Sequence, residues 1–363
     1  MSSAGATEDL DDDVTPPPPP PPDLPAKPKR GKGRILAKIA LGLLVAVLWV
    51  SAGGLGTYWV LTDRYEGMVA KEDILSDVPM APPPPAGESA PLNYLILGSD
   101  TRAGDPVTGP EATGSRSDTI MIAHVSKDRK NAFIFSIPRD SYVNVPPGGN
   151  WHGGNNKINA AMSFGGANLA AKTVYDLTRI PLNGAVIVNF QGIQTMVSAV
   201  GGVRVCIPYT VRSSFTSKVW KKGCHDLSPK DAEEFVRQRK GTPGGDLGRI
   251  KNQQHVVKGL IAKVKADGLL TSPAKLDGLM TTAAKSLTLD KSMNLTQLAL
   301  EVKDIDQENI KFATTPITGT MTTDAGSSVG LDLPACEELF AAVRDDKTDQ
   351  WLTAHPQPEV ASI

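Results

Sequence analysis

The sequence predicts an α/β fold, in which helices cover both faces of a mixed central sheet and one transmembrane helix precedes the sheet domain. Short apolar runs of strand length alternate with segments whose apolar residues recur at helical spacing, a pattern typical of helices packed on a buried sheet. A stretch of 23 uncharged residues, Ile39–Leu61, is long enough for a helix to cross a bilayer. The chain of 363 residues leaves room for one large domain after it.

Composition excludes several classes of protein. The net charge of −1 gives no basic field for nucleic acid, so no nucleic-acid partner is expected. Three cysteines and five histidines fit no zinc-binding spacing. A Walker A motif for nucleotide binding is absent.

The N-terminal part predicts membrane attachment. Residues 1–34, which are acids, consecutive prolines and then basic residues, predict a disordered cytoplasmic tail. The transmembrane helix covers 35–62, and the basic residues before it place the N-terminus in the cytoplasm and the rest outside the cell membrane. A cleaved signal peptide is the alternative, but the long preceding tail favours a single-pass anchor. Residues 63–91 are expected to be a Pro-rich extracytoplasmic linker.

The sheet domain is expected at 92–345, followed by a flexible tail at 346–363. Strands are predicted at 93–97, 120–125, 132–137, 185–188, 203–207 and 310–315. Helices are predicted at 157–177 with an interruption at Gly165–Gly166, at 191–200, 228–235, from the 244–249 turn through 265, at 273–286, 295–302 and 333–343.

Two cysteines are placed for a disulfide. Cys206 and Cys224 flank a 17-residue polar loop, and closing it outside the cell would stabilise the fold by about 3 kcal/mol. Two unpaired thiols are the alternative. Cys336 lies in an apolar helical pattern and is expected to be a buried free thiol.

Charged residues gather at predicted strand ends. The strands 120–125 and 132–137, joined by a charged turn, predict an antiparallel pair that brings Thr119 near Pro138. The residues that flank this pair then share one edge of the sheet: Arg116, Asp118, Arg139 and Asp140. Asp100 and Arg102, which follow the end of strand 93–97, are expected at the same edge.

A second group of charges comes about a hundred residues later. Arg237 and Arg239, two apart, share a face only in an extended segment, so we expect the helix to end near Phe235 and both arginines to face one site. A solvated basic helix end is the alternative. A Gly-rich turn then presents Asp246 and Arg249 at a helix N-terminus, which suits an anion. Arginines favour bidentate phosphate binding, and the acids beside them favour one Mg²⁺.

With these motifs the chain resembles the LytR-CpsA-Psr (LCP) phosphotransferases of bacterial cell envelopes over residues 92–265. The matching segments are 98–102 (GSDTR), 116–119 (RSDT), 136–140 (SIPRD), 157–160 (KINA), 201–203 (GGV), 235–240 (FVRQRK), and 245–249 (GDLGR) with Gln253–Gln254. Two positions depart from the family pattern. Residues 197–200 lack an acid, and Asn252 replaces a frequent arginine.

The resemblance implies a Mg²⁺-dependent enzyme, with Mn²⁺ as a substitute ion, that moves a glycopolymer with one phosphate from a polyprenyl pyrophosphate carrier onto peptidoglycan. Asp100 and Asp118 would hold the metal. The pyrophosphate would bind Arg102, Arg116, Arg139, Arg237, Arg239 and Arg249. The catalytic residues would be Arg116, Arg139, Asp246 and Arg249, with Asp246 orienting Arg249 or deprotonating the acceptor hydroxyl. Asp140 would fix the direction of Arg139.

The resemblance leaves alternatives open. The prenyl chain would need an apolar slot near Met162, Val174 and Val197, although the pattern favours these residues as ordinary core. A pyrophosphatase that uses water as acceptor, and a non-enzymatic envelope protein that binds lipid phosphates, would both use the same site. The glycopolymer could be teichoic acid, arabinogalactan, capsule or protein glycan.

Overall fold

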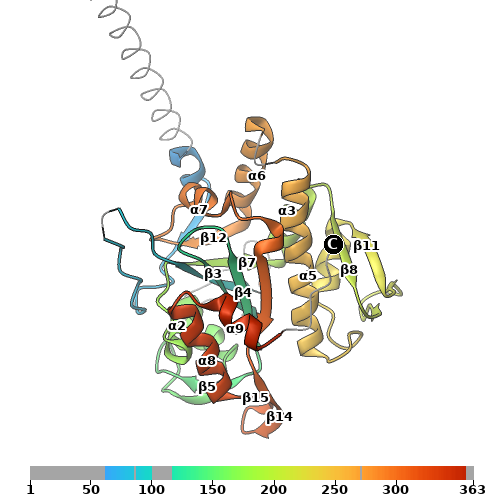
Figure 1. Ribbon diagram of the computed structural model, residues 1–363. Helices are drawn as coiled ribbons and strands as arrows, with labels where there is room; N and C mark the ends of the chain where they lie inside the picture. Colours follow the sequence, from blue (N-terminus) through green and yellow to red (C-terminus); the bar gives the residue numbers. More distant parts are fainter. Residues whose placement is uncertain (1–61, 86, 100–116, 270–271, 357–363) are drawn as a thin grey trace, which may run out of the picture. The chain divides into compact units, whose positions relative to one another are not determined.

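The centre of the fold is a seven-stranded sheet with the order β1-β12-β7-β2-β3-β4-β13 (Figure 1). The computed structural model describes residues 62–85, 87–99, 117–269 and 272–356. The strands are β1 (Ala70–Glu72), β12 (Leu287–Asp290), β7 (Gly184–Asn189), β2 (Leu92–Ser99), β3 (Ser117–Val125), β4 (Ala132–Ile137) and β13 (Ile310–Thr314). Parallel pairs (β1–β12, β2–β7, β4–β13) mix with antiparallel ones, which confirms the predicted mixed sheet.

The predicted strand pair is the antiparallel pair β3–β4. Ile120 faces Ile137 across the pair, so Thr119 and Pro138 lie next to each other as expected. The charged turn closes with a hydrogen bond from the Ser126 amide to the Asn131 carbonyl (3.0 Å). All six residues of β4 are buried, as expected for a strand covered on both faces.

Helices cover both faces of the sheet. On one face, α2 (Ala160–Thr178), α8 (Leu333–Arg344) and α9 (Thr348–Ala354) share a core with Leu95 and Phe135 of the sheet. On the other face, α5 (Asp246–Ala266) packs over β3 and β4, while α6 (Pro273–Ser286) and α7 (Leu295–Val302) pack over β7 and β12. Alternation along β2 divides the two cores, because Leu95 and Leu97 face one side and Ile96 faces the other. The predicted break at Gly165–Gly166 is present in α2.

A smaller core lies beside α5. It is built by α3 (Phe190–Ala199), β8 (Val203–Ile207), β9 (Val211–Arg212), β10 (Val219–Trp220), β11 (Gly223–Leu227) and α4 (Pro229–Val236), and Trp220 packs edge-on against Phe235 at its centre. Cys206 and Cys224 face each other across the β8–β11 pair and form the predicted disulfide. Cys336 is free and buried, as expected, and burial raises the pKa of its thiol to about 11.

Three short elements complete the described chain. They are the hairpins β5 (Tyr142–Val145) with β6 (Gly154–Lys157) and β14 (Ile317–Thr323) with β15 (Gly326–Leu331), and one 3₁₀ turn (Gln307–Asn309). None of the three was predicted from the sequence.

The domain begins earlier than the sequence predicted. Residues 63–80, expected to belong to a linker, include a helical turn and the edge strand β1. Tyr65, Ile74 and Leu75 are buried, and the Asp290 carboxylate accepts hydrogen bonds from the amides of Ile74 and Leu75 (2.9 Å each). Only the end of the expected linker, residues 82–85 and 87–89, forms an exposed stretch as a linker would.

The domain also ends later than predicted. The expected flexible tail at 346–363 contains α9, whose Trp351 is buried against Phe133 with ring centroids 6.0 Å apart. The expectation was wrong for 346–354 because one tryptophan supplies enough apolar area to hold a short helix on the core. Residues 357–363 lie outside the described residues.

The predicted cytoplasmic tail (1–34) and transmembrane segment (35–62) lie outside the described residues, apart from Thr62. Among the helices that the structure does describe, none combines the length and hydropathy needed to cross a bilayer.

Candidate functional site

Six charged side chains from four parts of the chain meet at one edge of the sheet. Together they form the Arg–Asp cluster, whose members are Asp118 on β3, Arg139 and Asp140 after β4, Arg239 after α4, and Asp246 and Arg249 in the first turn of α5. Three arginines and three aspartates alternate, so the formal charges of the cluster sum to zero. All six were predicted from the sequence as members of one site.

The β3–β4 register creates the first pair of the cluster. Two residues beyond the Ile120–Ile137 partners, Asp118 and Arg139 leave the sheet side by side. Arg139 Nη1 donates a hydrogen bond to Asp118 Oδ1. An arginine is therefore fixed at a strand end by the same pairing that builds the sheet.

A glycine turn presents the second pair. Gly244 and Gly245 have φ angles of +81° and +61°, a region that favours glycine. There is no room for a side chain at Gly248, because an added Cβ would lie 2.2 Å from the Pro243 carbonyl oxygen. This turn starts α5 at Asp246 without a side-chain cap.

Arg249 contacts both the strand β3 and the first turn of its own helix, α5. Its Nη2 lies 2.8 Å from Asp246 Oδ1, one helical turn earlier. The same nitrogen donates to the Asp118 carbonyl oxygen (3.1 Å), and Nη1 lies 3.7 Å from Asp118 Oδ1. With 2% of its surface exposed, Arg249 is fixed in direction before any ligand arrives.

Asp246 is the centre of the cluster. Its Oδ1 lies 3.5 Å from Arg139 Nε and 3.3 Å from Arg239 Nε, besides the contact with Arg249. Asp140 lies behind two of these arginines, at 3.8 Å from Arg139 Nε and 3.7 Å from Arg239 Nη2. That position agrees with the predicted role of Asp140 in directing Arg139.

Burial and charge act against each other in the cluster. Burial is the main influence on Asp246 and raises the pKa of its carboxyl, against the opposing effect of the arginines. Burial likewise lowers the pKa of Arg249. For Arg139 burial acts in the same direction, but the three aspartates together outweigh it and raise the pKa of this guanidinium.

Several buried polar atoms of the site have no hydrogen bond. They are both carboxylate oxygens of Asp246, the Nε atoms of Arg139 and Arg249, and Oε1 of Gln253. The 2.8 Å approach of Arg249 to Asp246 is thus an ion pair without hydrogen-bond alignment. Buried groups of this kind are uncommon in folded proteins, and here they offer both donors and acceptors to a ligand.

Gln253 is the residue that sequence reasoning left out of the site. It is 6% exposed and follows Arg249 by one helical turn. The spacing 246, 249, 253 puts all three side chains on one helix face, and this signal could have identified it. Its neighbour Gln254 has a structural role, because Nε2 donates to Ser136 Oγ (3.1 Å) and the Ala313 carbonyl (2.9 Å).

The structure accounts for one departure from the family pattern and for part of the other. Asn252 donates to the Phe235 carbonyl (3.3 Å) and Thr242 Oγ1 (3.1 Å) and accepts from the Tyr209 hydroxyl (3.2 Å), so it fixes the turn that carries Arg239. In the segment 197–200, Val197 and Val200 are buried in the smaller core, where an acid would have no place, whereas Ser198 and Ala199 are exposed and the structure does not explain why neither is an acid.

Arg237 does not join the cluster, contrary to expectation. The helix α4 does end close to the predicted residue, at Val236, but Arg237 keeps αR geometry and the chain continues in turns. Arg237 and Arg239 therefore diverge. Arg237 Nη1 donates to Glu233 Oε1 (2.8 Å), and its guanidinium lies between two aromatic rings.

Three predicted site residues lie outside the described chain. Asp100, Arg102 and Arg116 fall in the segment 100–116. The flanking residues Ser99 and Ser117 are paired across β2 and β3, directly before Asp118. Their roles stay predictions.

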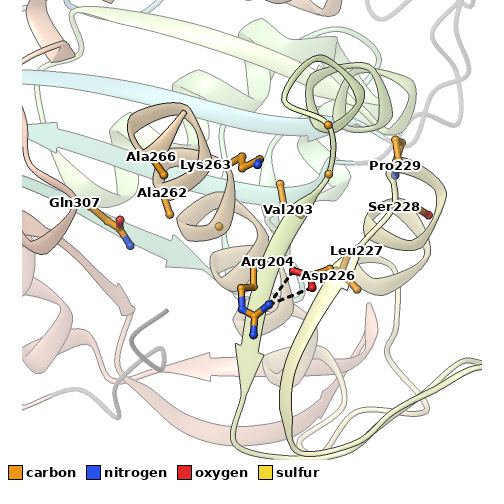
Figure 2. A pocket seen from close by; sticks show the side chains of 13 residues that line it. Val203, Arg204, Asp226, Leu227, Ser228, Pro229, Ala262, Lys263, Ala266 and Gln307 are labelled. Atoms are coloured by element: carbon orange, nitrogen blue, oxygen red, sulfur yellow. Dashed lines mark hydrogen bonds and ion pairs between the residues drawn. The ribbon is translucent and has the colours of Figure 1, made fainter. Parts of the chain in front are cut away.

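The region suggested for a prenyl slot is solid core. Met162, Val174 and Val197 are at most 1% exposed and belong to packed clusters, as the pattern favoured. A cavity of about 710 Å³ lies elsewhere, between the C-terminal half of α5 and strands β8 and β11 (Figure 2). The ion pair of Arg204 and Asp226 (3.1 Å) stands at its wall, and no member of the Arg–Asp cluster lines it.

These features define a class: an α/β protein with a half-buried arginine–carboxylate site suited to phosphate esters. Residues 66–344 match the LytR_cpsA_psr family, and the chain belongs to it. The probable cell wall biosynthesis protein LcpB of Corynebacterium glutamicum is 30% identical over 331 residues, which cover 88% of this chain and 72% of LcpB.

Two further relatives agree. The polyisoprenyl-teichoic acid–peptidoglycan teichoic acid transferase TagU of Enterococcus faecalis is 32% identical over 237 residues, which cover 64% of this chain and 72% of TagU. The crystal structure of protein gbs0355 from Streptococcus agalactiae superposes with a TM-score of 0.60 at 25% identity, over 70% of this chain and 88% of that one. The family resemblance predicted from the motifs is confirmed.

Proposed function

We propose that this chain is a membrane-anchored phosphotransferase that moves a glycan, with one phosphate, from a polyprenyl pyrophosphate to peptidoglycan. The observation that carries the proposal is the Arg–Asp cluster, in which buried arginines are held in fixed directions by aspartates. Family membership and the transferase name of a relative support the same reaction.

The arginines of the cluster would bind the pyrophosphate. Phosphoryl transfer depends on positioning and on neutralising charge more than on covalent catalysis. Arg139 and Arg249 are held by three aspartates, whereas the side chain of Arg239 is 46% exposed and can follow a ligand. Because the charges of the six residues cancel, an incoming pyrophosphate needs added positive charge, which Arg102 and Arg116 or a metal ion would supply.

Asp246 would accept the proton of the attacking hydroxyl. Its oxygens are buried without hydrogen bonds, and its raised pKa is the direction that suits a general base. The hydroxyl oxygen of the acceptor forms a bond to the phosphorus next to the glycan. The bond from this phosphorus to the bridging oxygen breaks, polyprenyl phosphate leaves, and the proton passes to Asp246.

The residues present fit a Mg²⁺ site in part. Within the described chain, no three His, Cys, Asp or Glu side chains are grouped to hold a metal ion. Mg²⁺ often uses one or two carboxylates together with substrate phosphates, which Asp118 and the predicted ligand Asp100 would provide. Bound there, Mg²⁺ or Mn²⁺ would neutralise phosphate charge.

The cellular setting of the proposal is the outer face of the cell membrane. The segment 35–62 would anchor the chain, and the Cys206–Cys224 disulfide suits an oxidising compartment outside the cytoplasm.

The test measures transfer of glycan from a lipid-linked donor to peptidoglycan by the full chain and two variants. Arg139→Lys keeps the charge but loses the fork that reaches Asp118, so transfer should fall about 100-fold or more. Arg204→Ala is the matched control, since its exposed ion pair joins β8 to β11 beside the C-terminal half of α5, away from the cluster, and it should keep wild-type rates.

Wild-type rates in Arg139→Lys, with unchanged thermal unfolding, would exclude the cluster as the site. Phosphate or prenyl phosphate released at the same rate without peptidoglycan would point to the pyrophosphatase instead. Donor binding without turnover, with either metal ion, would point to a lipid-binding protein.

A further inference from the structure

An aromatic platform stands beside the Arg–Asp cluster. It consists of Phe190 at the start of α3, Phe215 in the loop between β9 and β10, and Arg237 after α4. The guanidinium carbon of Arg237 lies 4.9 Å from the centroid of each ring, so the cation is stacked between them. Three separate segments of chain converge to build this stack.

Phe215 is unusual in its exposure. It is 55% exposed, and every other aromatic residue in the described chain is buried or half-buried. Arg237 beside it has a side chain that is 41% exposed. One guanidinium N–H goes to Glu233, and a guanidinium has five, so donors remain at the solvent edge of the stack.

The loop that carries Phe215 is held firmly. Ser213 Oγ accepts hydrogen bonds from the amides of Phe215 (3.0 Å) and Thr216 (2.9 Å). Thr216 Oγ1 donates to Glu234 on α4 (2.6 Å). An exposed aromatic ring on an ordered loop loses little conformational entropy when it binds, which is typical of recognition residues.

Gln238 joins this loop to the cluster. It is fully buried, and its Oε1 accepts hydrogen bonds from the amide (2.8 Å) and hydroxyl (3.1 Å) of Ser214. The residue before it is Arg237 of the platform, and the residue after it is Arg239 of the cluster. The platform therefore flanks the place where the pyrophosphate would bind.

We propose that Phe215 and Arg237 bind a sugar ring of one of the two glycan substrates, which makes Phe215 a specificity-determining residue. This inference rests on the proposed function. The exposed ring face of Phe215 would stack on the C–H face of a pyranose. Arg237 would donate to a hydroxyl, N-acetyl or carboxylate oxygen of that sugar.

The test uses the full chain in detergent with the variants Phe215→Ala, Phe215→Tyr and Val219→Ala. Val219 lies in the same hairpin and is 37% exposed, which makes it a matched control outside the platform. Tryptophan fluorescence, to which the buried Trp220 packed on Phe235 contributes, and thermal unfolding report whether each variant keeps the fold. Binding is measured by calorimetry with a lipid-free peptidoglycan fragment and, separately, with the lipid-free donor glycan.

Stacking on an aromatic ring contributes about 0.5–1.5 kcal/mol, so Phe215→Ala should weaken binding of one ligand about 2- to 10-fold. The KM for that substrate should rise by the same factor with kcat unchanged, while Phe215→Tyr and Val219→Ala keep wild-type values. The ligand that responds identifies the source of the sugar as donor or acceptor.

Unchanged binding of both glycans by a folded Phe215→Ala variant would overturn the inference, even if transfer itself is observed. A wild-type chain without transfer activity would instead contradict the proposed function, and the binding measurements would still decide the role of Phe215.

Discussion

The substitution Asp246→Asn tests the chemistry assigned to the centre of the cluster. It keeps the size of the side chain but removes the charge that faces Arg139, Arg239 and Arg249 at 2.8–3.5 Å. A general base contributes about 10²–10⁴-fold to rate, so kcat should fall at least 100-fold. Asp246→Glu, which keeps a carboxylate, should retain more activity than the amide.

The pH profile separates a base from a residue that only positions Arg249. A base acts when deprotonated, so wild-type kcat should rise with pH through the pKa of Asp246, which burial raises above the ordinary value. The residual activity of Asp246→Asn should lack this rise. Activity within fivefold of wild type, or an unchanged acid limb in the variant, would show that Asp246 is not the general base.

Stability gives an independent reading of the same carboxyl group. Because its folded pKa is raised, the native state binds more protons than the unfolded state, and wild type loses stability as pH rises from the unfolded value of about 3.9 through the folded one. Asp246→Asn lacks this loss. The free energy of unfolding, measured by denaturation at pH 4 and pH 7, should therefore rise for the variant relative to wild type as pH rises.

Three further predictions concern the scaffold. Gly248→Ala should destabilise by about 1–3 kcal/mol and slow transfer, because its Cβ would meet the Pro243 carbonyl at 2.2 Å. Gly278→Ala is the urea-denaturation control: nothing lies within 4 Å of its added Cβ on the exposed face of α6, so it should stabilise by about 0.5–1 kcal/mol through helix propensity. Trp351→Ala should destabilise by about 3–5 kcal/mol in the same assay, whereas a change under 1 kcal/mol would mean that α9 is dispensable. Burial lowers the pKa of His255 from 6.5 to about 4, so the native state excludes a proton that the unfolded state takes up. The free energy of unfolding of the wild type should therefore fall by about 3 kcal/mol as pH falls from 6.5 to 4. The variant His255→Leu should lack that loss.

Local patterns allowed much of the fold to be predicted. The helices at 273–286 and 295–302 and the strands at 132–137 and 203–207 have the bounds that periodicity and flanking residues indicated. These segments carry their signal within themselves: a cap, a proline at the first turn, or a continuous apolar run.

Two elements that could not be predicted, β1 and α9, are held in place by residues that lie far away in the sequence. The edge strand β1 is held by β12, more than two hundred residues later, and the segment after it is held by the Asp290 carboxylate, so the three residues of β1 carry no pattern of their own. The helix α9 is likewise held by its own Trp351, which packs on Phe133 of the distant strand β4.

The site shows the same division. Charges flanking the β3–β4 pair and the glycine turn could be placed together because strand register and helix start are local features. The direction of Arg237 could not, because it depends on Phe190 and Phe215 from other segments. Gln253 was identifiable from helical spacing once Arg249 was assigned.

In the proposed reaction, the Arg–Asp cluster transfers one phosphate together with the glycan. The most direct measurement labels the glycan-side phosphate of the lipid-linked donor and follows the label with the full chain and peptidoglycan. The label should become bound to peptidoglycan, one phosphate per transferred glycan, in a reaction that depends on Arg139. Label recovered only in soluble phosphate or in the prenyl phosphate would contradict it.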